Sequence, residues 1–349
     1  MTPRHDNTRD ERGVAMMYVA VFLLSSLWLV SLAVDMGKLM TTKTELQKAA
    51  DSAALAGASA IDPSNGTLIQ ATARTRSALA ASGNTALRET AEPVVIDPNV
   101  DVVFPAGTRK VTVTVHREAA TGNPMTTIFA RSLGIKSLNV HANATAEAAP
   151  LTKDCDHLLP FAPAMLANGA PFSKACGSTY TLHADPALAN GGNFQLLSFP
   201  TCNEGPCAGM PSSGASTVRC LMTNGYGCCI SIGDTFVNTK PGNNVGPVRQ
   251  GLQQRWDSDT DLRTGICYQQ YTGNGDRVMP VPIVTTFAGL NGRTDATITG
   301  FAGFFMTIRP SGGSSTMQIT GQFIDYVAPG EAGGGPPPPN ALYTVRLVE

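Results

Sequence analysis

The sequence has few charged residues and almost no net charge. Asp, Glu, Lys and Arg make up 15% of its 349 residues, and the formal net charge is -1. Soluble domains usually carry roughly 25% charged residues. A near-neutral chain has no electrostatic attraction to a polyanion, so nucleic acid is not an expected partner.

The chain also lacks the common catalytic motifs. It has no G-x-S-x-G elbow, no H-E-x-x-H pair and no glycine-rich phosphate loop. The histidines are His5, His116, His141, His157 and His183. Two of them, His116 and His141, fall in alternating segments, which favours strand residues over general bases. We therefore predict no enzymatic activity and no cofactor; an exported hydrolase without a recognisable motif remains an alternative.

Cysteine is absent outside one region of the chain. All eight cysteines lie there: Cys155, Cys176, Cys202, Cys207, Cys220, Cys228, Cys229 and Cys267. An even number confined to one region predicts disulfides and an oxidising compartment. Free thiols in a cytosolic protein are the alternative, and zinc is disfavoured because no C-x2-C pair occurs.

The pairing of the cysteines is open, since eight cysteines allow about 105 connectivities. The adjacent Cys228 and Cys229 are the exception. A bond between neighbours strains the backbone, so each is predicted to bond a different partner.

A long apolar run near the start predicts a membrane anchor. Residues 14–34 carry no charge. As a helix, at about 1.5 Å per residue, they would cross the roughly 30 Å core of a bilayer. A cleaved signal peptide is the alternative, because Ser31-Leu32-Ala33 has the small-x-small form of a cleavage site. The run is longer than the usual 7–15 residues of such a signal, which favours an uncut anchor.

The charges that flank this run do not decide its orientation. Three arginines (Arg4, Arg9, Arg12) precede it and three lysines (Lys38, Lys43, Lys48) follow it. The predicted disulfides do decide it, since they need an oxidising side. We expect a single-pass protein of the bacterial inner (cytoplasmic) membrane, with a short cytoplasmic N-terminus and an extracytoplasmic C-terminal body.

Helical sequence continues beyond the apolar run. Residues 35–60 are rich in helix formers, and the alanines of the second half would allow close packing against a neighbouring surface. A second helix is predicted over 67–82, with Ser64 or Asn65 as its cap and Gly83 at its end. Its apolar face would comprise Leu68, Thr72, Thr75 and Leu79.

Alternating segments follow and predict a small sheet. Residues 110–117 and 137–146 alternate between apolar and polar side chains, and 100–104 is a partner strand. Residues 124–133 are predicted to form a short helix that ends at Gly134. A long helix on such a sheet is a pilin-like arrangement.

The composition changes after residue 150, where cysteine, glycine and proline become frequent. Strands are predicted at 278–287, 302–308, 317–327 and 342–348, with an exposed loop at 330–339. The fold class is therefore α+β. The predicted parts are a cytoplasmic N-terminus (1–13), a transmembrane helix (14–34), a pilin-like α+β domain (35–150) and a Cys-rich, β-rich domain (151–349).

Two loops are candidates for a functional site. Asp257, Asp259 and Asp261 alternate along the chain and form a weak calcium candidate. However, Leu262 and Tyr268 stand where an EF-hand loop needs Gly and Glu, and a solvated loop explains the acids equally well. The second loop, residues 240–243, has the Pro-Gly order of a type II turn and is predicted to connect two strands rather than to contact a partner.

Two stretches resemble the TadG-related family of Flp/Tad pilus-assembly proteins. The first, residues 11–60, has E-R-G, the apolar run, V-D-x-G and L-Q-x-A-A-D-x-A-A-L-A-G-A. The second is GDTFVNTKPGNNVGPVRQGLQQR, residues 233–255. Two features of the family are missing. The sequence has no D-x-S-x-S metal motif, which occurs in members with a von Willebrand A domain. It also lacks the prepilin pattern, in which Glu stands five places after the Gly that is cleaved, because Tyr18 stands five places after Gly13.

The resemblance implies a structural or assembly role in tight-adherence pili. The expected partners are the lipid bilayer and other pilus or envelope proteins, in a homo- or hetero-oligomer. An adhesin or binding module, displayed on the pilus or the cell surface, is the alternative function.

Overall fold

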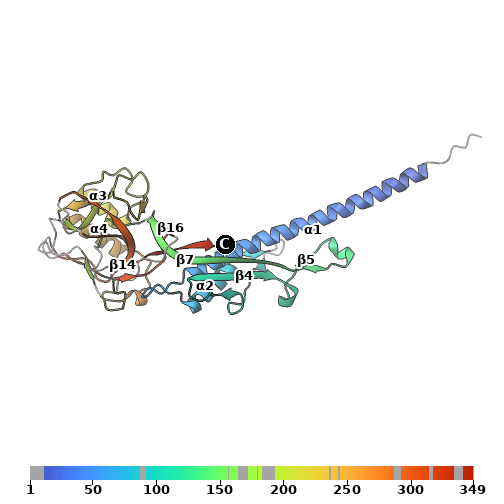
Figure 1. The fold of residues 1–349 in the computed structure, drawn as a ribbon, viewed down its shortest axis with the longest axis horizontal. Coiled ribbons are helices and arrows are strands. Elements are labelled where there is room, and N and C mark those ends of the chain that lie inside the picture. Colours follow the sequence, from blue (N-terminus) through green and yellow to red (C-terminus); the bar gives the residue numbers. More distant parts are fainter. Residues whose placement is uncertain are drawn as a thin grey trace, which may run out of the picture.

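The structure, a computed structural model, is an α+β protein in which a long helix leads into two packed bodies (Figure 1). It describes residues 12–86, 92–155, 157–163, 172–178, 180–182, 193–235, 237–242, 244–286, 292–313, 317–333 and 341–348. The predicted cytoplasmic N-terminus thus lies almost wholly outside the described residues, as do His5 and His183. The predicted fold class is confirmed.

The first helix, α1 (Arg12–Ala58), has 47 residues and would be about 70 Å long. Its first part projects away from the rest of the molecule (Figure 1). It is long and apolar enough to cross a membrane, and none of its most apolar window is buried. The predicted continuation of the apolar run into one uninterrupted helix is confirmed.

The second part of α1 is buried through its alanines. Ala49, Ala50, Ala53 and Ala54 are completely inaccessible, together with Leu46. Such small side chains let the helix axis approach its neighbours closely, while the covered apolar surface stabilises the contact. The predicted role of the alanines in close packing is confirmed.

Helix α2 (Gln70–Ser82) packs against α1 and ends before Gly83, as predicted, but it begins later than the predicted residue 67. It buries Ala73, Ser77 and Ala81, whereas Leu79 is 72% exposed. The predicted apolar face was therefore wrong, because the close approach of α1 selects small side chains rather than the largest ones. The predicted caps were wrong as well, since Ile69 precedes the helix without a side-chain cap.

The sheet beneath α1 is antiparallel, in the order β3 (Val102–Val103), β4 (Lys110–Arg117), β7 (Val140–Asp154), β17 (Tyr343–Val348). The three valines of β4 point into the core formed with α1, as their alternation predicted. The long strand β7 passes through residue 150, where the sequence suggested a domain boundary. Strand β17 comes from the end of the chain and pairs with β7 from Tyr343 opposite Pro150 to Val348 opposite Thr145.

Between β4 and β7 the chain leaves the sheet as a hairpin. Strands β5 (Met125–Thr126) and β6 (Ser137–Leu138) pair with each other. The loop between them, residues 127–136, contains the 3-10 helix η2 (Ala130–Leu133), which ends at Gly134 in a left-handed conformation. The predicted helix over 124–133 was thus wrong apart from this last turn. We call residues 127–136 the β5–β6 loop.

In its described residues, the second body contains two further antiparallel sheets and two α-helices. Its sheets are β12 (Val278–Val284), β14 (Ile298–Met306), β15 (Ile319–Ile324) with β8 (Tyr180–Leu182), and β13 (Asp295–Ala296), β11 (Val237–Pro241) with β9 (Asn193–Ser198). Helices α3 (Ala215–Asn224) and α4 (Val245–Ser258) pack on each other. The four strands predicted after residue 270 are all present, with shifted ends.

Two short strands join the far end of β7 to the second body. These are β10 (Ile230–Ser231) and β16 (Gly330–Ala332), which both pair with β7 near Asp154. The prediction of a loop over 330–339 was therefore wrong for Gly330–Ala332, while residues 334–339 lie outside the described part. Four very short elements are also present in the described part of the chain: the strands β1 (Thr85–Ala86) and β2 (Glu92–Pro93), and the 3-10 helices η1 (Ala119–Thr121) and η5 (Tyr268–Gln270).

Candidate functional site

The structure places a buried carboxylate at the point where α1 leaves its apolar segment. Asp35 is 4% exposed. Its Oδ1 accepts a hydrogen bond from the backbone N–H of Ile128 at 2.8 Å. Its Oδ2 accepts from the N–H groups of Phe129 at 3.0 Å and Ala130 at 2.6 Å. One side chain thus fastens the β5–β6 loop to the helix.

The same contacts set the electrostatics of Asp35. The N–H groups of Ile128 and Ala130, assisted by Phe129 and Lys38, lower the pKa of the carboxyl, and burial opposes them in part. A carboxylate that accepts several backbone hydrogen bonds is held in its charged form. Phe129 is the N-cap of η2 and Ala130 its first residue, so their amides have no intrahelical partner and are satisfied by Asp35 instead.

The loop itself is closed by its own hydrogen bonds. Thr127 donates its backbone N–H to Lys136 at 3.2 Å and its hydroxyl to Ile135. The hydroxyl of Ser132 donates to the carbonyl of Phe129 at 2.7 Å. The loop is thus built as a compact turn and held against α1 at a defined height.

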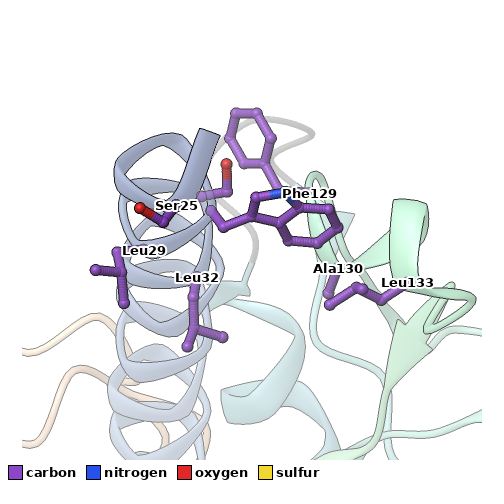
Figure 2. Close-up of a pocket in the computed structure, with 8 residues that line it drawn as sticks. Ser25, Leu29, Leu32, Phe129, Ala130 and Leu133 are labelled. Carbon is purple, nitrogen blue, oxygen red and sulfur yellow. The ribbon is translucent and has the colours of Figure 1, made fainter. Parts of the chain in front are cut away.

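A groove runs between the loop and α1 (Figure 2). It has a volume of about 520 Å³ and is lined almost entirely by apolar atoms. Leu32 on the helix and Ala130 with Leu133 on the loop lie on opposite sides of it (Figure 2). The lining residues are Ser25, Trp28, Leu29, Ser31, Leu32, Phe129, Ala130 and Leu133.

The apolar side chains of the loop are only partly covered by the rest of the described structure. Ile128, Phe129, Leu133 and Ile135 are between 43% and 61% exposed. A cluster of large exposed apolar side chains on a short loop is unusual for a surface in water. The sequence alone identified neither Asp35 nor this loop as part of a site. The V-D-x-G motif and the Ile-Phe pair are local signals for them, but neither reveals that they meet.

The eight cysteines of the second body form four disulfides. These are Cys155–Cys229, Cys176–Cys267, Cys202–Cys228 and Cys207–Cys220. The adjacent Cys228 and Cys229 bond to different partners, as predicted. Cys155–Cys229 ties the end of β7 to the segment before β10, and so joins the first sheet to the second body.

The three acids of the calcium candidate each bind protein donors. Asp257 accepts two hydrogen bonds from Arg309, at 2.7 and 2.8 Å. Asp261 is paired with Arg263, which lowers the pKa of the carboxyl. Asp259 accepts from the amide of Asp261 at 2.7 Å and from the hydroxyl of Tyr271. Within the described ranges, no group of three or more His, Cys, Asp or Glu side chains is arranged to hold a metal ion.

A buried arginine organises this acidic loop. Arg277 donates to the carbonyls of Asp261 at 2.7 Å and Met306 at 2.9 Å, and its guanidinium lies 4.0 Å from the ring centre of Trp256. Burial lowers the pKa of Arg277, and Asp259 and Asp261 oppose that shift. Asp259 and Asp261 thus belong to a packed, internally paired part of the core, whereas Asp257 lies in an exposed ion pair with Arg309.

The two strand histidines and the predicted turn at residues 240–243 are the remaining positions that the sequence singled out. His116 lies opposite His141 on the neighbouring strand, and its Nδ1 is 3.6 Å from the carboxylate of Asp101, an acid that sequence proximity did not indicate. In residues 240–243, Gly242 has the positive φ (80°) that the predicted turn requires. The turn connects strand β11 to helix α4, so the prediction of two flanking strands was wrong; Asn243 lies outside the described residues.

Comparison with known proteins gives one finding. Residues 13–60 match the family model Tad, described as "Putative Flp pilus-assembly TadE/G-like". The match spans most of α1, including Asp35 and the buried alanines. The search of curated proteins and the search of solved structures returned no match. The resemblance of residues 233–255 lies outside the matched region and stays a prediction.

Proposed function

We propose that this chain, with its TadE/G-like N-terminal region, is a membrane-anchored structural component of a Tad/Flp-type pilus assembly apparatus. It would act without catalysis or a cofactor. Its body would lie on the extracytoplasmic side of the bacterial inner (cytoplasmic) membrane. The partners would be the bilayer and other pilus or envelope proteins.

The observation that carries the proposal is the continuity of α1. The helix is exposed and apolar over residues 14–34, yet further along it Ala49, Ala50, Ala53 and Ala54 are completely buried beneath α2 and β4. A continuous helix of this kind couples a membrane span rigidly to the folded body. Asp35 reinforces the coupling, because it ties the body's hairpin to the helix at the end of the apolar segment. Such rigidity suits a part that positions other proteins at a fixed height above a membrane.

The disulfides support the orientation. Four of them in one body are typical of an oxidising compartment, outside the bacterial cytoplasm. The flanking arginines and lysines are balanced and do not oppose this orientation.

The topology can be tested with fusions at the C-terminus. A periplasmic alkaline phosphatase reporter joined after Glu349 should be active, and a fluorescent reporter that folds only in the cytoplasm should be dark. The chain should stay with the membrane after alkaline carbonate extraction. The reverse reporter pattern would refute the orientation, and release of the chain by carbonate would refute the anchor.

The structural role can be tested by breaking the rigidity of α1. Met40 is 63% exposed and lies between the apolar segment and the buried alanines. Met40→Pro removes a helical hydrogen bond and bends the helix there, and the side chain that it replaces is an exposed one. We expect the variant to be anchored and folded but unable to support surface pili, whereas Met40→Ala should retain them. Normal piliation by Met40→Pro would argue against a rigid coupling.

Deletion of the gene separates this role from the alternative of a surface adhesin. Loss of filaments in electron micrographs supports assembly. Normal filaments with poor attachment to surfaces would favour the adhesin and count against the proposal.

A further inference from the structure

We propose that the β5–β6 loop is a second membrane-contacting element, which inserts its apolar side chains into the extracytoplasmic leaflet beside α1, with lipid acyl chains filling the groove between them. This inference rests on the proposed membrane anchor, and the experiment below separates the two. The ligand is the bilayer itself.

The position of the groove identifies its occupant. Its helical wall consists of residues between Ser25 and Leu32, which belong to the charge-free segment that would lie in lipid. The opposite wall is formed by Phe129, Ala130 and Leu133 and is therefore held at the same height. A surface at that height is surrounded by acyl chains unless another protein covers it.

The chemistry of the loop agrees with this environment. Its four exposed apolar side chains would lose contact with water on entering the leaflet, which is favourable. Arg131 and Lys136 are exposed on the same loop, and their long stems can carry the charges to the headgroups. Anionic headgroups attract such basic residues.

A second transmembrane helix fits the groove less well than lipid does. Helices associate in membranes through small residues such as glycine and through polar side chains that bond across the interface. Residues 14–34 contain no glycine. The two serines of the groove already donate within the helix, Ser25 to Phe22 at 2.9 Å and Ser31 to Leu27 at 2.6 Å.

Asp35 sets how far the loop reaches along the helix. It holds the amides of residues 128–130, so the apolar tip cannot fold back onto the body without breaking these bonds. The contacts therefore present the apolar side chains toward the membrane.

The test uses tryptophan as a depth probe in the full chain, reconstituted in phosphatidylcholine vesicles with bromine on the acyl chains. The protein has two tryptophans, Trp28 and Trp256. One variant, Trp256→Phe, leaves Trp28 as the reporter of the span. A second, Trp28→Phe/Trp256→Phe/Phe129→Trp, reports on the loop. The matched control carries Leu79→Trp in the same background, because Leu79 is equally apolar and 72% exposed but lies on α2, beside the body.

We expect the tryptophans at 28 and 129 to be quenched strongly and the one at 79 to be unaffected. Quenching at 28 but not at 129 would overturn the inference and leave the anchor intact. No quenching at either position would overturn the anchor as well.

Trp256 packs against Arg277 in the core, so its replacement could disturb the fold. A second reporter therefore keeps both natural tryptophans. A spin label on Leu133→Cys should be more accessible to oxygen, which dissolves in lipid, than to a water-soluble nickel complex. The opposite ratio would refute the inference. Two results together would assign the groove to a helix of another protein and refute lipid as its occupant. They are cross-linking of the cysteine of Leu133→Cys to that helix, and no quenching of the tryptophan fluorescence of the Phe129→Trp variant.

Discussion

The closeness of α1 and α2 can be tested at one glycine. Gly57 lies within α1, and a Cβ added there would come 2.3 Å from the Oγ of Ser77 and 3.0 Å from Cγ1 of Val111. Ser77 is completely buried, and its hydroxyl is held by a hydrogen bond of 2.9 Å to the carbonyl of Ala53. The added methyl group of Gly57→Ala therefore displaces packed atoms.

The glycine at position 37 provides a matched control in the same helix. A Cβ added to Gly37 would meet nothing within 4 Å. Both substitutions gain about 1 kcal/mol of helix propensity, but only Gly57→Ala adds the cost of overpacking, about 1 to 3 kcal/mol. The free energies of unfolding of the two variants should therefore differ by about 1 to 3 kcal/mol, with Gly57→Ala the less stable.

Thermal unfolding of the full chain in detergent, followed by circular dichroism, measures this difference. At about 2 to 4 °C per kcal/mol, it should separate the two midpoints by several degrees. The double variant Gly57→Ala/Ser77→Ala removes the Oγ that is most crowded and should unfold at a higher temperature than Gly57→Ala alone. A midpoint of Gly57→Ala equal to that of Gly37→Ala would refute the close contact between the helices.

Two further predictions concern buried charges. Asp35→Ala should accelerate hydrogen exchange of the amides of residues 128–130, after correction for intrinsic rates; unchanged rates would contradict the anchoring contact. Since the pKa of Asp35 is lowered from its ordinary 3.8, the protection in the natural chain should be present above that pH and be lost only as the pH falls through the lower value. Lys174 pairs with buried Asp325 at 2.6 Å, so Lys174→Met should cost about 3 to 5 kcal/mol in urea unfolding, and adding Asp325→Asn should recover part of it; a neutral Lys174→Met would show that the pair is not buried as described.

Local patterns in the sequence determined the main elements. The uncharged run and the alanines after it predicted α1, because helix formation and burial in lipid depend on neighbouring residues. The alternation of residues 110–117 predicted β4 with its bounds. The confinement of the cysteines predicted disulfides, but not which of them pair.

Only the tertiary structure decided the contacts between distant residues. Asp35 meets amides more than ninety positions away, and β17 returns from the end of the chain to pair with β7. The buried face of α2 was decided by the space beside α1, which admits Ser77 and leaves Leu79 outside. Such contacts depend on which surfaces meet after the chain has folded, and no local pattern of side chains records that.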